Sequence, residues 1–174
     1  MKIFRFLLLL AATIALTACG TSHNYTNNSL NKNFYAEKPI YFKLNPKSQT
    51  LINFTGMHGT VLGGVVQPNV KETFQLSLNE LANETNVKLK FIENSEEITD
   101  KDALVFDADI SEINWHFGFS VATLKTVVNY KNISNNKEIQ TTGIRKSGGG
   151  DEKNNLKKSL KDATYNFLKE YEKL

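Results

Sequence analysis

The sequence has one cysteine, little excess of either charge and no hydrophobic run long enough to cross a membrane. A single cysteine excludes a disulfide framework within the chain. Lys and Arg number 21 against 18 Asp and Glu, and this near balance gives no electrostatic case for nucleic-acid binding. The longest apolar run covers residues 6–16, whereas a membrane-spanning helix needs about 20 apolar residues.

Side chains at metal-binding or catalytic spacings are also lacking. The three histidines are His23, His58 and His116, and none belongs to an H-x-x-x-H motif or lies near a C-x-x-C motif. The serine in "GFS", Ser120, does not fit the G-x-S-x-G pattern of a nucleophile elbow. We therefore expect no metal, no other cofactor and no enzymatic activity.

One group of acidic residues resembles a site only superficially. Asp107, Asp109 and Ser111 alternate along a predicted strand, so they share one of its faces. That arrangement would suit a cation or a pair of catalytic carboxylates. It is also what the solvated face of a strand contains when the other face packs on a core, and we favour this second interpretation.

The N-terminus has the plan of a secretory signal peptide. Lys2 and Arg5 form a short basic region, the apolar run over 6–16 follows, and small residues come next. A polar stretch over 20–33 succeeds them. Because the run is short and nothing apolar follows for it to pack against, we predict a segment that is removed rather than a buried helix.

Leu16, Thr17, Ala18 and Cys19 carry a specific resemblance. They resemble the lipobox of bacterial lipoprotein precursors, in which an apolar residue and two small residues precede the cysteine that receives the lipid. The resemblance implies cleavage between Ala18 and Cys19, diacylglycerol on the Cys19 sulfur and acylation of its new amino group. Three acyl chains would hold the protein at a membrane almost permanently. Gly20, in place of the Asp of an inner-membrane retention signal, favours the outer membrane.

Three segments follow from this interpretation. Residues 1–18 are the signal peptide, and 19–37 are the lipidated N-terminus and a flexible linker, rich in Asn, Ser and Thr, that reaches about 25 Å on average. Tyr25 and Phe34 in this linker are expected to be exposed to solvent. Residues 38–174 form a single globular periplasmic domain. Removal of Lys2 and Arg5 leaves 19 basic and 18 acidic residues, so the mature chain is nearly neutral.

The domain sequence predicts strands and two amphipathic helices. The first helix covers 69–85, with Asn69 as its N-cap, and the second follows Asp151, with Asp162 and Lys169 as ordinary surface charges. Alternating apolar residues and turn signals predict strands over 39–44, 49–55 and 87–91, and then a three-stranded meander over 103–146.

This order of elements predicts an α+β fold, a mainly antiparallel sheet with both helices packed on one face. It is similar to the order in small envelope lipoproteins of the YajG type and in the N-terminal domain of the TolB translocation protein. The similarity lies in the elements rather than in particular residues, so it assigns no functional residue.

Two apolar stretches are candidates for contact with a partner. The glycine-rich stretch over 56–69 contains Met57, Val61 and Leu62 where a polar loop is expected. Such a stretch is either an exposed contact surface or a buried strand or lid over the core.

The second stretch is "WHFGF". Alternation places Trp115, Phe117 and Phe119 on one face, which is the core or a contact surface, and His116 on the other. Gly118 marks a bulge or tight bend between two strands. An exposed sheet edge here would also accept a strand from another chain.

These observations predict a lipoprotein anchored in the outer membrane, with its domain in the periplasm, that acts without catalysis through protein contacts in envelope assembly, stability or transport. Its partners would be the membrane, through the lipid, and an envelope protein. The alternative is a surface-displayed lipoprotein that binds a ligand on a host or a neighbouring cell. A periplasmic enzyme or metal binder is the third class.

Overall fold

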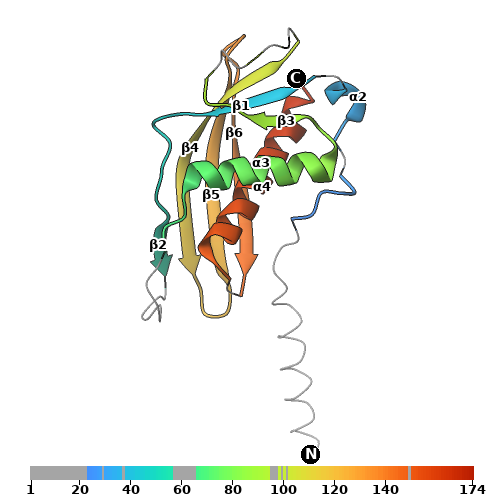
Figure 1. The fold of residues 1–174 in the computed structure, drawn as a ribbon. Coiled ribbons are helices and arrows are strands. Elements are labelled where there is room, and N and C mark those ends of the chain that lie inside the picture. The colour runs from blue at the N-terminus through green and yellow to red at the C-terminus, as the bar shows by residue number, and fades with distance from the viewer. Residues whose placement is uncertain are drawn as a thin grey trace, which may run out of the picture.

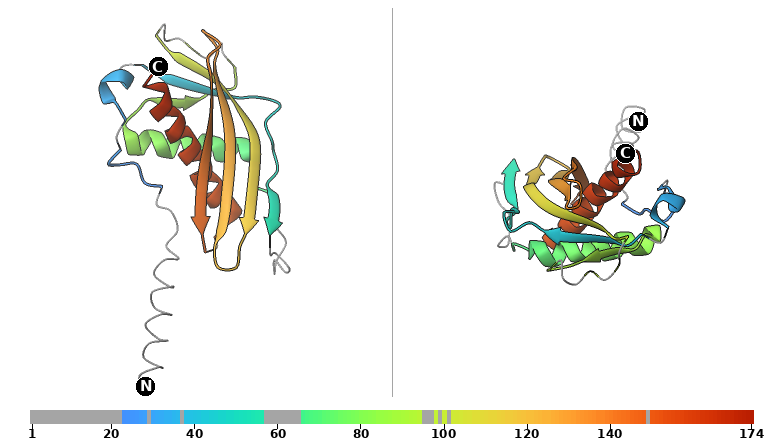
Figure 2. Two further views of the ribbon diagram at one scale, coloured as in Figure 1. Left: turned by 180° about the vertical axis from the view of Figure 1, so that it is seen from behind. Right: turned by 90° about the horizontal axis from the view of Figure 1, so that it is seen from above.

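The computed structural model describes residues 23–28, 30–36, 38–56, 66–94, 98, 100, 102–148 and 150–174. They form the α+β domain that the sequence predicts, a six-stranded sheet with two long helices on one face (Figures 1 and 2). The elements in chain order are α2 (Lys32–Tyr35), β1 (Ile40–Leu44), β2 (Asn53–Gly56), α3 (Val70–Thr85), β3 (Leu89–Phe91), β4 (Leu104–Phe117), β5 (Ala122–Asn132), β6 (Glu138–Ser147) and α4 (Glu152–Tyr171).

The sheet is mixed in direction. Its order is β3-β1-β4-β5-β6, and β2 pairs with β4 beyond the end of β1. The long strands β4, β5 and β6 form the predicted antiparallel meander, whereas β1 pairs in parallel with both β3 and β4, and β2 pairs in parallel with β4. The two strands that precede α3 therefore share one edge of β4 instead of forming a hairpin.

Two side chains fill the gap between β1 and β2. The side-chain amide of Gln49 accepts a hydrogen bond from the Ile113 N–H at 3.3 Å and donates one to the Ile113 carbonyl at 3.2 Å. The Ser48 hydroxyl accepts from the Ile110 N–H at 3.0 Å. These bonds replace the pairing that a continuous strand would supply, and the register of β4 against β5 shifts at the same level, between Ile110 and Glu112.

Both long helices begin at the predicted caps. The side chain of Asn69 accepts a hydrogen bond from the Glu72 N–H, and that of Asp151 accepts from the Asn154 N–H. Their apolar stripes are buried against the sheet. The stripe residues with the least exposure are Phe74, Leu78 and Leu81 in α3 and Leu156, Leu160, Ala163 and Phe167 in α4.

Helix α4 lies directly on the sheet at Gly143 of β6. A Cβ atom at this position would lie 1.9 Å from the Ser159 carbonyl oxygen and 2.6 Å from the Ala163 nitrogen. The close approach also lets Ser159 donate from its hydroxyl to the Gly143 carbonyl at 2.9 Å. Only glycine permits this helix-to-sheet distance.

The same helix closes the outer edge of β6. The Asp162 carboxylate accepts a hydrogen bond from the Ile144 N–H at 2.8 Å, and the Asn166 side chain donates to the Thr142 carbonyl at 2.9 Å. Unpaired edge groups can recruit a strand from another chain. Satisfying them with helix side chains disfavours strand addition at β6.

The predicted linker differs from the structure over residues 23–28 and 30–36. We predicted a flexible segment that ends at residue 37, but these residues lie along α3 and α4 (Figure 1), and Leu30 and Tyr35 are buried. The composition is polar, yet aromatic and apolar residues recur within it and find contacts on the helices. Residues 19–22 of the predicted linker lie outside the described part of the chain.

Candidate functional site

Residues 23–28 and 30–36, here called the strap, make their first firm contact through Tyr25. The Tyr25 ring stacks on the Tyr165 ring with centroids 4.0 Å apart. Its hydroxyl donates a hydrogen bond to Asp162 at 2.6 Å, and its backbone N–H donates to Glu84 at 3.0 Å. Burial, reinforced by the bond to Asp162, raises the pKa of the Tyr25 hydroxyl, so the group acts as a neutral donor.

Asp162 joins three parts of the molecule. Besides the Tyr25 hydroxyl it accepts from the Ile144 N–H, and Nδ1 of His23 lies 3.7 Å from its Oδ1 atom. Burial alone would raise the pKa of the Asp162 carboxyl, but the bonds from His23, Tyr25 and Ile144 outweigh burial and lower the pKa. The prediction of an ordinary surface charge is wrong here, because the strap and β6 both converge on this carboxylate.

Lys161 lies beneath Tyr25 and is 1% exposed. Its Nζ atom donates to Glu80 at 2.5 Å and to Glu84 at 2.7 Å, and it lies 5.7 Å from the centroid of the Tyr25 ring. Burial would raise the pKa of Glu80, but the ammonium groups of Lys157 and Lys161 lower it. Two carboxylates of α3 and one buried lysine of α4 thus form the floor under the strap.

The second half of the strap lies against the C-terminal end of α4. The Asn31 N–H donates to Glu172 at 2.8 Å, and the Tyr35 hydroxyl donates to the Leu168 carbonyl at 2.5 Å. The Phe34 ring meets that of Tyr171 edge-on, 6.1 Å between centroids. Phe34 was expected to be exposed to solvent, and so was Tyr25, but both contact the helices.

The strap is held to α3 and α4 by the contacts described above. Its polar groups bind one another or the helices, and within the described residues no group of three or more His, Cys, Asp and Glu side chains is placed to hold a metal ion. These contacts fix the N-terminal segment to the two helices.

The predicted contact residues divide into three cases. Met57, Val61 and Leu62 lie outside the described residues. Trp115 is only 3% exposed and packs beside Phe54 with ring centroids 5.9 Å apart, so its prediction as a contact residue is wrong, because its side of β4 faces the core. His116 is exposed on the opposite face, with Nδ1 3.2 Å from the Thr55 hydroxyl.

The acidic residues of β4 lie on the face of the sheet that no helix covers. Asp107 pairs with Lys43 of β1 and Lys131 of β5 in the strand register and accepts a hydrogen bond from the Asn45 side chain at 2.8 Å. Ser111, predicted to share their face, lies at the register shift and donates to the Val127 carbonyl. No helix covers this face, but Asp107 and Asp109 are half-buried, and the Oδ1 atom of Asp107 is buried without a hydrogen-bond partner among the described residues, so the interpretation of a solvated face is wrong for Asp107.

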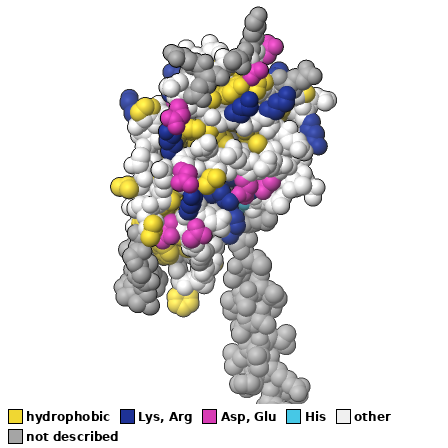
Figure 3. Space-filling model, viewed as in Figure 1, with side chains coloured by type: hydrophobic (Ala, Val, Ile, Leu, Met, Phe, Trp, Pro, Cys, Tyr) yellow, Lys and Arg dark blue, Asp and Glu magenta, His cyan; other side chains and the backbone are white. Residues whose placement is uncertain are grey.

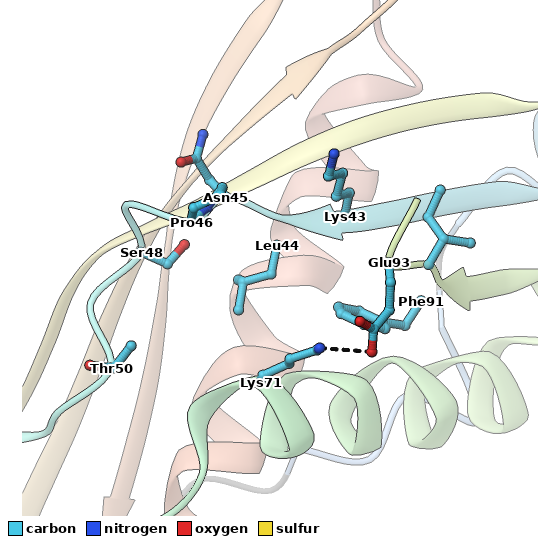
Figure 4. Close-up of a pocket in the computed structure, with 10 residues that line it drawn as sticks. Lys43, Leu44, Asn45, Pro46, Ser48, Thr50, Lys71, Phe91 and Glu93 are labelled. Atoms are coloured by element: carbon cyan, nitrogen blue, oxygen red, sulfur yellow. Dashed lines mark ion pairs between the residues drawn. The ribbon is translucent and has the colours of Figure 1, made fainter. Parts of the chain in front are cut away.

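A pocket of about 260 Å³ lies between the C-terminal ends of β1 and β3 and the first turn of α3, and Figure 4 shows the residues that line it. Leu44 and Phe91 supply apolar surface. Lys71 and Glu93 at its rim form an ion pair at 2.7 Å, so each neutralises the other.

Phe119 is the residue that the sequence pattern misplaced. Alternation predicts it beside Trp115 and Phe117, but it is 92% exposed at the tip of the β4–β5 hairpin. Strand β4 ends at Phe117, and the Gly118 N–H bonds to the Val121 carbonyl to close the predicted tight bend. The glycine before Phe119 was the available signal that the alternation stops there.

Comparison with known proteins yields no family and only distant structural likenesses. No protein-family model and no curated protein matches the sequence. A PelC dodecamer from Paraburkholderia phytofirmans is 5% identical over 74% of this chain and 84% of its own, with a TM-score of 0.36. A neuraminyllactose-binding hemagglutinin homolog from Helicobacter pylori is 13% identical over 79% and 89%, also with a TM-score of 0.36.

A third similar structure is a hypothetical protein from Chlamydia trachomatis, 11% identical over 76% of this chain and 93% of its own, with a TM-score of 0.34. Likenesses at this level carry no conclusion about function. Within the described part of the chain, no helix is long and apolar enough to span a membrane.

Proposed function

We propose that this chain is a bacterial lipoprotein precursor whose mature form is anchored in the outer membrane by lipid on Cys19. The mature domain acts in the periplasm without catalysis. It works through protein contacts in envelope assembly, stability or transport. The observation that carries the proposal combines sequence and structure. Three residues, 20–22, separate the lipobox-like Leu16–Cys19 segment from a strap that is clamped to the domain.

The clamp changes the expected reach of the domain from the membrane. A free linker over 19–37 would reach about 25 Å on average. With the strap bound, four residues join the lipid to His23, and they span at most about 14 Å when fully extended. The domain would therefore stay next to the bilayer, where anchoring raises its local concentration for weak contacts.

The face that contains α3 gives no electrostatic case for nucleic-acid binding. Figure 3 shows cationic and anionic side chains interspersed over the face that contains α3, without a patch of one sign. Nucleic-acid binding would need a basic stripe or patch. Exposed positions on the helix-free face of the sheet, such as His116, are available for a partner.

The anchor is tested by replacing its lipid acceptor. Cys19→Ala is expected to abolish incorporation of labelled palmitate and to remove the protein from the outer-membrane fraction. Gly20→Asp is the matched control, since it retains the cysteine: palmitate is still incorporated, while the protein moves to the inner membrane. Palmitate labelling that persists in Cys19→Ala would refute the proposal.

The compartment and partner need a separate experiment in living cells. A photoreactive residue in place of His116 is expected to yield a discrete adduct with an envelope protein, identified by mass spectrometry. External protease should leave the domain intact in whole cells and cut it after the outer membrane is opened. Cleavage in intact cells would favour display on the cell surface.

A further inference from the structure

The tip of the β4–β5 hairpin presents an uncharged surface with an exposed aromatic ring. Residues 117–122 contain no charged side chain, and Phe119 projects from them with 92% of its surface exposed. A large aromatic side chain presented in this way by a tight bend contributes nothing to the core. Phe, like Trp and Leu, is one of the residues that surface-bound segments bury at the boundary between lipid headgroups and acyl chains.

The hairpin tip and the N-terminal end of α4 lie at the same end of the molecule. Ala122, just after the tip, pairs with Ser147 at the end of β6, and Gly148 lines a shallow surface pocket together with Phe119. Helix α4 begins at Glu152, a few residues further on. Figure 1 shows the hairpin and this end of the helix at the lower end of the molecule.

The strap directs the chain toward that same end. Asn31 and Tyr35 bind near the C-terminal end of α4, at Glu172 and Leu168, while Tyr25 binds at Asp162 in the middle of the helix. Followed backward, the strap thus moves along α4 toward its N-terminal end.

The length of the remaining chain matches the distance to be covered. Asp162 lies ten residues from Glu152, about 15 Å along the helix axis at 1.5 Å per residue. Residues 19–22 span up to about 14 Å. When extended, this segment therefore brings Cys19 close to the level of the N-terminal end of α4, at the end of the molecule that contains the hairpin tip, whereas the β5–β6 turn lies at the far end of β5, 11 residues long, or about 36 Å away.

We propose that the β4–β5 hairpin tip is a second point of membrane contact, at which Phe119 enters the interfacial region of the phospholipid bilayer while the lipid on Cys19 holds the chain. This inference rests on the lipid anchor proposed above. Two contacts at one end make the long strands stand upright on the membrane, with the β5–β6 turn pointing away from it. Each contact raises the effective concentration of the other at the bilayer.

The test uses the intact lipidated protein in vesicles of phosphatidylethanolamine and phosphatidylglycerol that contain nitroxide-labelled lipid. Because Cys19 is the only cysteine and its sulfur carries the lipid, an introduced cysteine is the single free thiol. Ser120→Cys places an environment-sensitive fluorophore at the tip, and Ser134→Cys places it in the β5–β6 turn, where the residue is also exposed. Fluorescence is expected to be quenched at 120 and unchanged at 134.

A second variant separates Phe119 from the anchor. Phe119→Ser combined with Ser120→Cys should abolish the quenching while the protein still floats with the vesicles and keeps its melting temperature, since 92% of the Phe119 surface is exposed. Equal quenching at 120 and 134, no quenching at 120, or quenching that survives Phe119→Ser would overturn the inference and leave the anchor standing. Protein that fails to float with vesicles would instead refute the anchor, and this contact with it.

Discussion

At the scale of single residues, the stability of the strap depends on charges that the sequence presents as ordinary. Asp162 accepts hydrogen bonds from the strap and from the edge of β6, and Lys161 is buried between two glutamates of α3. Neither residue lies on the apolar stripe of α4. Their roles arise only when three segments far apart in the sequence meet.

Asp162→Ala should destabilise the domain by about 2 kcal/mol, because it leaves the Tyr25 hydroxyl and the Ile144 N–H without their charged acceptor. Asp109→Ala, on the helix-free face of β4, is the control and should cost no more than about 0.5 kcal/mol. Urea denaturation of both variants measures the difference. Equal effects would mean that Asp162 is not a structural acceptor.

The contribution of Asp162 should also depend on pH. Its pKa is lowered in the folded state, so the stabilisation is complete above the usual aspartate pKa of about 4 and is lost as the pH falls through the lower, folded value. Compared by urea denaturation at pH 5 and at pH 3, the stability advantage of the wild type over Asp162→Asn should shrink on acidification. An advantage that stays constant or grows would contradict the assigned pKa direction.

Lys161→Ala should be among the more damaging substitutions, at about 3 kcal/mol, because it leaves the partly buried Glu84 without its ion-pair partner and leaves Glu80 paired with Lys157 alone. Lys153→Ala removes an exposed ion pair between the same two helices, at Glu72, and should cost less than about 1 kcal/mol. Thermal unfolding of the two variants distinguishes a buried from an exposed pair. Similar melting temperatures would argue against a buried role for Lys161.

At the scale of elements, α4 is the component on which the others converge. It covers β5 and β6, closes the β6 edge and carries the strap.

Gly143→Ala should destabilise the domain by at least about 2 kcal/mol, because the new methyl group overlaps the backbone of α4. Gly148→Ala meets no atom within 4 Å and should leave the melting temperature unchanged. Comparable losses in both would exclude close packing as the cause.

The sequence predicts the elements better than the contacts between them. The caps at Asn69 and Asp151 and the burial of both apolar stripes are local properties, so periodicity and cap chemistry were sufficient to predict them. The parallel pairing of β1 and β2 with β4 depends on the side chains of Ser48 and Gln49, which carry no sequence signal for that role. The strap was missed because its polar composition is typical of linkers, and its few aromatic residues reveal their function only against α4.

At the scale of the whole molecule, the strap decides how the domain would be presented to a partner. With the strap bound, the proposed anchor would be short and one end of the domain would face the lipid. With the strap detached, the domain would be joined to the membrane by a long flexible linker and would have no fixed orientation. The proposed lipid on Cys19 would be the same in both states, so anchoring experiments alone do not distinguish them.

Hydrogen–deuterium exchange of the lipidated protein on vesicles tests the bound strap most directly. Peptides covering residues 23–36 should exchange much more slowly than the exposed β5–β6 turn, because the N–H groups of Tyr25 and Asn31 are hydrogen-bonded to glutamates of the two helices. Tyr25→Ser should speed exchange in the strap peptides without changing the exchange rate of peptides from α4. Strap peptides in the wild type that exchange as fast as the turn would contradict the account, since the domain would then hang from a long free linker.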